Sequence, residues 1–86
     1  MQVGVQFRGT LAAGETQKWL TVEWPEDWQI VWSLVPTSPA SGAGPQLASE
    51  MEVERNAGNR LNYWFTVHNL GSTAMDFEAR YAIVRP

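Results

Sequence analysis

Residues 62–68 read Asn62-Tyr63-Trp64-Phe65-Thr66-Val67-His68. Successive side chains of a β-strand point to opposite faces, so this alternation predicts a strand with one wholly apolar face. The other face is polar except for the indole of Trp64, which we expect on the outside. A large aromatic ring among polar neighbours on an exposed face commonly contacts a ligand, another subunit or a cross-strand residue.

The same period of two continues along the chain in both directions, and no segment of useful length shows helical spacing. It predicts strands at residues 3–9, 16–24, 28–35, 50–54, 60–69 and 75–83. Turn-forming residues separate these strands at intervals of roughly 8 to 12 residues. The chain is therefore predicted to be all-β, a single-domain antiparallel β-sandwich of about six to seven strands over residues 1–86.

The phase of each strand predicts its inward side chains. In the 16–24 strand, Trp24 shares a phase with Leu20 and Val22, so these face inward and Trp19 is expected on the outside. In the 50–54 strand, glutamates alternate with apolar residues and face outward. The inward side chains of the 50–54 and 75–83 strands are expected to be Met51, Val53, Met75, Phe77, Ala79, Tyr81 and Ile83.

Three further tryptophans, Trp24, Trp28 and Trp32, are expected to be core residues. An alternative places Trp24 and Trp28 on a binding rim beside residues 36–46. That segment is rich in proline, glycine and serine, which predicts a mobile loop. Apolar residues in both phases of the 28–35 strand predict a central strand that is covered on part of each face.

The two predicted hairpins place polar residues around Trp64. A hairpin centred on Gly58 pairs Glu52 with Trp64, and a hairpin centred on Gly71 pairs Trp64 with Glu78. An aromatic plane flanked by carboxylates and amides suits a sugar ring, and it also suits a cationic group. Simple cross-strand packing is the alternative explanation. The expected ligand-binding residues are Trp64, Glu52, Glu78, Asn62, Arg80 and Trp19.

Composition limits the other classes of partner. Eighty-six residues form one domain, and without cysteine there is no disulfide and no thiolate metal site. The net charge of −3 disfavours nucleic acid and anionic membranes. No apolar stretch approaches the roughly 20 residues of a membrane span. The N-terminus has the pattern of a strand rather than of a signal peptide, which is compatible with the cytoplasm.

Catalysis and metal binding have little support in the sequence. His68 is the only histidine, so no multidentate metal site is expected. A triad of His68 with Ser72 and Asp76 would lie on a turn without the sequence signature of an activated nucleophile. Alternating Glu50, Glu52 and Glu54 are typical of a solvated strand that resists edge-to-edge aggregation. We therefore expect no enzyme activity, no catalytic residues and no cofactor.

Two segments have a family resemblance. The stretch Gly9-Thr10-Leu11-Ala12-Ala13-Gly14-Glu15-Thr16-Gln17-Lys18-Trp19 resembles the opening of pre-peptidase C-terminal modules, which are small β-sandwiches attached to secreted bacterial enzymes. The stretch Val67-His68-Asn69-Leu70-Gly71-Ser72-Thr73-Ala74 is similar to a strand-turn-strand of immunoglobulin-like accessory domains. The resemblance implies a small bacterial accessory module and transfers no functional residue, because the aspartate-rich calcium segment of the first family is missing.

These observations leave two classes of function open. The first is a small non-catalytic binding module, lectin-like, that binds carbohydrate or another small ligand through surface tryptophans. The second is a self-assembling module in which the exposed aromatic residues form a homo-oligomer interface. The two classes differ in what covers Trp19 and Trp64.

Overall fold

The computed structural model describes residues 1–84, which form six strands and no helix. The strands are β1 (Gln2–Leu11), β2 (Thr16–Pro25), β3 (Gln29–Ser38), β4 (Leu47–Arg55), β5 (Arg60–Asn69) and β6 (Met75–Val84). The all-β class is thus confirmed. Within the described residues there is no helix of the length and apolar character that a membrane crossing requires.

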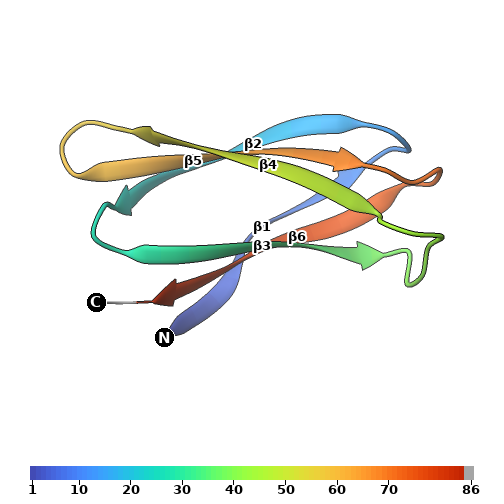
Figure 1. Cartoon of the computed structure of the whole chain (residues 1–86), viewed down its shortest axis with the longest axis horizontal. Coiled ribbons are helices and arrows are strands. Elements are labelled where there is room, and N and C mark those ends of the chain that lie inside the picture. Colours follow the sequence, from blue (N-terminus) through green and yellow to red (C-terminus); the bar gives the residue numbers. More distant parts are fainter. Residues whose placement is uncertain (85–86) are drawn as a thin grey trace.

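The strands form two three-stranded antiparallel sheets, with the orders β1-β6-β3 and β2-β5-β4. Figure 1 shows the sheets as two layers. In residues 1–84, β4 and β5 are the only consecutive strands that share a sheet, and every other connection passes between the layers. The predicted β4–β5 register is confirmed, because Glu52 pairs with Trp64 and Glu54 pairs with Asn62. The predicted hairpin centred on Gly71 is wrong, because β6 pairs with β1 and β3 instead.

The core lies between the sheets and takes side chains from both. Its buried members are Leu11, Met75 and Phe77 from one sheet and Tyr63, Phe65 and Val67 from the other. The ring of Trp32 bridges the layers, with its centroid 4.9 Å from that of Phe65. The inward phases predicted for β5 and β6 are therefore confirmed. These two central strands bury the alternate side chains that the sequence pattern marked as apolar.

Strand β2 has the opposite phase from the predicted one. Trp19 points inward, where it stacks on Phe7 at 5.7 Å and meets Phe77 edge-on at 5.0 Å. Space for the indole exists because Gly9 has no side chain, and a Cβ there would lie 2.8 Å from Trp19 Cζ2. The expectation of an outward Trp19 is wrong, and Leu20 is exposed instead.

A bulge in β2 explains the phase error. The pairing with β5 shifts between Thr21 and Trp24, and Glu23 within the shift adopts a positive φ of 69°. An extra residue in one strand reverses the inside-outside alternation beyond it. Trp24 therefore faces inward although Val22, two residues earlier, is exposed. The prediction of an inward side chain is therefore correct for Trp24 itself. It is wrong for the residues of β2 that precede the bulge.

Strand β3 is an edge strand rather than the predicted central strand, and its outward Val31 is 51% exposed. Strand β4 is the edge of the other sheet. Met51 and Val53 pair with the inward Phe65 and Tyr63, so they lie on the predicted inner face. Each is nevertheless 51% exposed, because an edge strand is covered on only one side.

The segment predicted as a loop at 36–46 is shorter in the structure. Strand β3 continues to Ser38, and Pro36 pairs with Phe77 of β6. The connection that remains, 39–46, is joined to the β5–β6 turn by a hydrogen bond in which the Leu70 N–H donates to the Gln46 carbonyl at 2.9 Å. The mobility of this loop stays a prediction.

Candidate functional site

Trp64 lies on the outer face of β5, the central strand of its sheet, and is partly exposed. Its direct neighbours across the sheet are Leu20 on β2 and Glu52 on β4. The indole borders a shallow hollow of about 340 Å³, which is lined by Lys18, Glu52, Val53, Glu54 and Trp64. An aromatic ring and charged groups therefore share one open surface.

Hydrogen bonds fix the orientation of the indole. Trp64 Nε1 donates to Glu54 Oε1 at 2.9 Å, and Asn62 Nδ2 donates to the same oxygen at 3.1 Å. Asn62 is buried, and its own Oδ1 accepts a hydrogen bond from the backbone N–H of Glu23 at 3.2 Å. Asn62 thus links the β2 bulge to Glu54, and Glu54 in turn holds the ring.

Two acidic side chains and one basic side chain line the hollow beside the ring. Hydrogen bonds from Trp64 and then from Asn62 lower the pKa of Glu54 below its ordinary value. Lys18 Nζ lies 3.6 Å from Glu52 Oε1, so an exposed ion pair spans the outer face. Such exposed pairs contribute little to stability, which leaves these groups free to exchange partners with a ligand.

Three of the six residues expected in the site come together: Trp64, Glu52 and Asn62. Glu78 and Arg80 lie on β6, in the opposite sheet, and do not flank Trp64. Trp19 is in the interior. The prediction that Glu78 and Arg80 flank Trp64 is wrong, because it depended on a β5–β6 hairpin. The separate prediction of an exposed Trp19 is wrong because β2 has a bulge.

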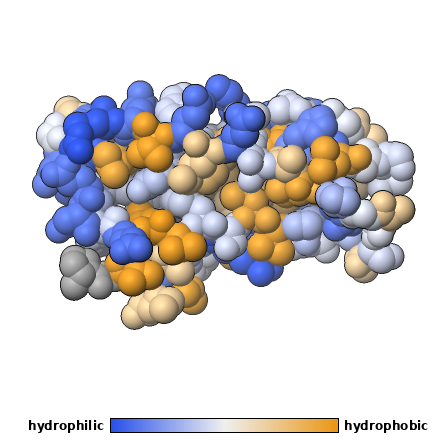
Figure 2. Space-filling view, viewed as in Figure 1, coloured by the Kyte–Doolittle hydropathy of each residue, from blue (hydrophilic) through white to orange (hydrophobic). Residues whose placement is uncertain are grey.

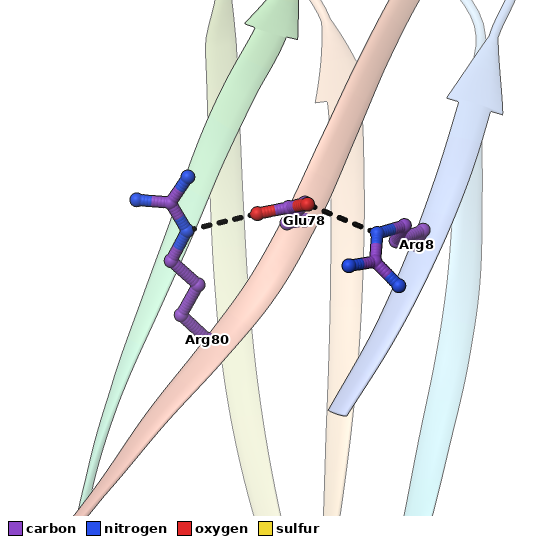
Figure 3. A network of polar contacts seen from close by, with 3 residues as sticks. All are labelled: Arg8, Glu78 and Arg80. Carbon is purple, nitrogen blue, oxygen red and sulfur yellow. Dashed lines mark hydrogen bonds and ion pairs between the residues drawn. The ribbon is translucent and has the colours of Figure 1, made fainter. Parts of the chain in front are cut away.

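Glu78 has its own partners on the other sheet. Arg8 Nε donates to Glu78 Oε2 at 2.9 Å and Arg80 Nε donates to Glu78 Oε1 at 3.0 Å, as Figure 3 shows. These two hydrogen bonds lower the pKa of Glu78. Both carboxylate oxygens are engaged, so this cluster is an ion-pair network that joins β1 to β6.

Lys18, Glu54 and Leu20 are members of the site that sequence reasoning missed. Lys18 and Leu20 share the sequence phase of Trp24, which predicts the inner face of β2, but the bulge places them on the outside. Glu54 was paired with Asn62 correctly, but its bond to Trp64 spans ten residues and depends on side-chain reach. A glutamate two positions from the cross-strand partner of a tryptophan is the available signal.

The other candidates separate in the structure. The Trp24–Trp28 turn, where the rings lie 6.4 Å apart, is at the opposite end of β3 from the 39–46 loop, as Figure 1 shows. His68 Nδ1 is hydrogen-bonded to Thr16 Oγ1. Asp76 lies on the other sheet and accepts hydrogen bonds from Thr10 and Ser38. Residues 1–84 contain no cluster of three or more side chains suited to a metal ion.

No protein-family model matches the sequence, and no curated protein or solved structure matches it with statistical significance.

Proposed function

We propose that this protein is a small non-catalytic module that binds neutral carbohydrate through the outer face of the β2-β5-β4 sheet. The observation that carries the proposal is the partly exposed Trp64 ring, oriented by Glu54 at the side of an open hollow with charged groups. A sugar ring stacks its apolar side on an aromatic plane and directs its hydroxyls to carboxylates and ammonium groups. Glu52, Glu54 and Lys18 supply these groups.

The charge of the site favours an uncharged sugar. Glu52 and Glu54 border the ring, and among the described residues Lys18 is the only cation that lines the same hollow. A sialic or uronic acid would bring its carboxylate toward two others. The open, shallow shape suits one or two exposed sugar units and not an enclosed small molecule.

The two contacting sheets support classifying the domain as an antiparallel β-sandwich, an architecture shared by many small binding modules. The resemblance to bacterial accessory modules implies the same architecture. The alternative is an oligomer interface formed by exposed tryptophans. It is less well supported, because one of its two tryptophans, Trp19, is in the interior.

Trp64→Ala should abolish retention on an array of neutral glycans while the protein stays folded. The substitution removes the stacking surface, and the side chain lies outside the core cluster. Retention on the array and the melting temperature are measured on the same preparations. Trp64→Phe, which keeps an aromatic face but loses the Nε1 donor, should weaken retention without abolishing it.

Two results would contradict the proposal. One is wild-type protein that retains no glycan of any class. The other is a Trp64→Ala protein that binds as well as wild type, which would move the site elsewhere. Binding of a quaternary ammonium compound in place of glycans would identify the ring as a cation site instead.

Glycan binding should survive mild acid and fail only in strong acid. The folded-state pKa of Glu54 is lowered, so its contribution is complete above the ordinary glutamate pKa of about 4.3. That contribution is lost as the pH falls through the lowered value. Retention on the glycan array, measured from pH 7 downward, should therefore be constant to about pH 5. It should decline when the pH falls below the ordinary pKa range of glutamate. Glu54→Gln is the control, because it removes this titration while keeping an acceptor for Trp64.

A further inference from the structure

One side of the molecule exposes apolar side chains along two strand edges. Strands β3 and β4 are the edges of the two sheets on this side, and they lie in front in Figure 1. Met51 and Val53 of β4 are each half-exposed there. Figure 2, in the same view, shows apolar side chains exposed between polar ones across this face. Such exposure on a small domain marks a contact surface.

The four edge strands differ in their protection against pairing with another chain. Strand β4 carries Glu50, Glu52 and Glu54, so a two-fold pairing of β4 with itself would place glutamate against glutamate. Bulges interrupt two of the other edge strands, β2 at Glu23 and β1 at Gln6. In residues 1–84 the edge β3 has the longest regular stretch without charge, proline or bulge, 29–35, whereas that of β1 ends at Val5.

We propose that a second copy of this chain pairs with β3 in an antiparallel, two-fold arrangement. A two-fold axis at Ser33 pairs residues 31–35 with the same residues of the second copy, so Val31 lies opposite Val35 and no charged residues oppose each other. The two β1-β6-β3 sheets then join into one continuous six-stranded sheet. Both β3 edges are consumed, so the assembly closes as a dimer and does not grow into a filament.

The outer face next to β3 is apolar as well, so the apolar surfaces of the two copies become continuous across the strand pair. Next to Val31, the outer face of the β1-β6-β3 sheet has a mostly apolar hollow of about 460 Å³. Its lining includes Val3, Val5, Val31, Val35 and Ala82. A stable interface buries about 800 Å² on each partner, so side chains that flank the strand pair contribute to the contact as well.

The dimer leaves Trp64 accessible. Trp64 lies on the outer face of the other sheet, on its central strand, and not on the β3 edge. Two chains would then present two Trp64 surfaces on one rigid body. Two linked sites raise the strength of attachment to a surface with repeated ligands, without any new contact at either site.

Light scattering after size-exclusion chromatography tests the proposal with a Ser33→Lys variant. Wild-type protein at micromolar concentration should have twice the 9.7 kDa mass of one chain. Ser33 is exposed, and its cross-strand partner Arg80 has its charge paired with Glu78, so the lysine is tolerated in a single chain. At the two-fold axis it opposes its own copy beside two Arg80 side chains, and we expect a monomer. An equimolar mixture of Ser33→Lys and Ser33→Glu should restore the dimer mass, because opposite charges then meet at the axis.

Gln6→Lys is the matched control, since it adds the same charge to the β1 edge, and it should remain dimeric. A monomeric wild type, a dimeric Ser33→Lys or a mixture that fails to associate would overturn the proposal. Dissociation by Gln6→Lys would overturn it in favour of β1. Circular dichroism verifies that every variant is folded. Trp64→Ala should leave the dimer mass unchanged, so failure of glycan binding and failure of dimerisation are distinguishable.

Discussion

Phe65→Ala is expected to lower the free energy of unfolding by about 3 to 5 kcal/mol, enough to unfold much of so small a domain. Phe65 is 1% exposed on the central strand β5. Its ring lies 4.9 Å from that of Trp32 and 5.9 Å from that of Phe7, both in the opposite sheet. Truncation removes two of the ring contacts that join the layers and leaves a cavity that large rigid rings cannot fill. Urea denaturation followed by tryptophan fluorescence measures the loss.

Val22→Ala is the control for this measurement, because Val22 is half-exposed on the outer face and should change the stability by less than about 1 kcal/mol. If Phe65→Ala unfolds at nearly the wild-type urea concentration, the inner and outer faces of β5 have been assigned in reverse. Far-ultraviolet circular dichroism in the absence of urea distinguishes a destabilised protein from one that is already unfolded.

The regular strands could be predicted from the sequence because their burial is regular. In β5 and β6 every second side chain meets the opposite sheet, so apolar and buried positions coincide from Tyr63 to Val67 and from Met75 to Ala79. The β4–β5 register could be predicted too, because a short turn at Gly58 leaves few ways to pair the strands. The same reasoning correctly placed Trp64 on the outside, beside Glu52.

The phase of β2 could not be read from alternation alone. The bulge at Glu23 depends on Asn62, whose side chain accepts a hydrogen bond from the Glu23 N–H across the sheet. The inward position of Trp19 depends on the missing side chain of Gly9 on another strand. Both causes are contacts between residues far apart in the sequence, and neither leaves a local signal at Trp19.

The partner of β6 was the largest error in the site prediction. A five-residue connection such as 70–74 can close a hairpin or cross between sheets, and its glycine and serine content suits both. Asn69 accounts for the crossing. Its Nδ2 donates to the carbonyls of Leu11 at 3.2 Å, Ala12 at 3.0 Å and Thr73 at 2.8 Å. One side chain therefore fixes the start of the turn against the end of β1, in the other layer.

Asn69→Ala is expected to cost about 2 to 4 kcal/mol of stability, a large effect for a residue that contributes no apolar surface. Asn69 is 1% exposed, and its Oδ1 also accepts from the Gly71 N–H at 2.9 Å. Alanine leaves these polar backbone groups without their partner in a buried setting. Thermal and urea denaturation measure the loss. Asn59→Ala, the same substitution at an exposed position of the β4–β5 turn, should be nearly neutral.

Asn69→Asp separates the hydrogen bonds from the packing, because the side chain keeps its shape but loses its donor. At neutral pH the carboxylate faces three carbonyl oxygens, so the variant should be at least as unstable as Asn69→Ala. Protonation restores a donor, and burial beside carbonyls raises the folded-state pKa of the new carboxyl above its unfolded value. The loss of stability relative to wild type, compared at the same pH, should therefore shrink as the pH falls toward about 4. It should be smallest when the pH reaches the ordinary aspartate pKa of about 3.9. An Asn69→Asp protein that is as stable as wild type at neutral pH would mean that Asn69 acts through its volume, and the crossing of β6 to the other sheet would need another cause.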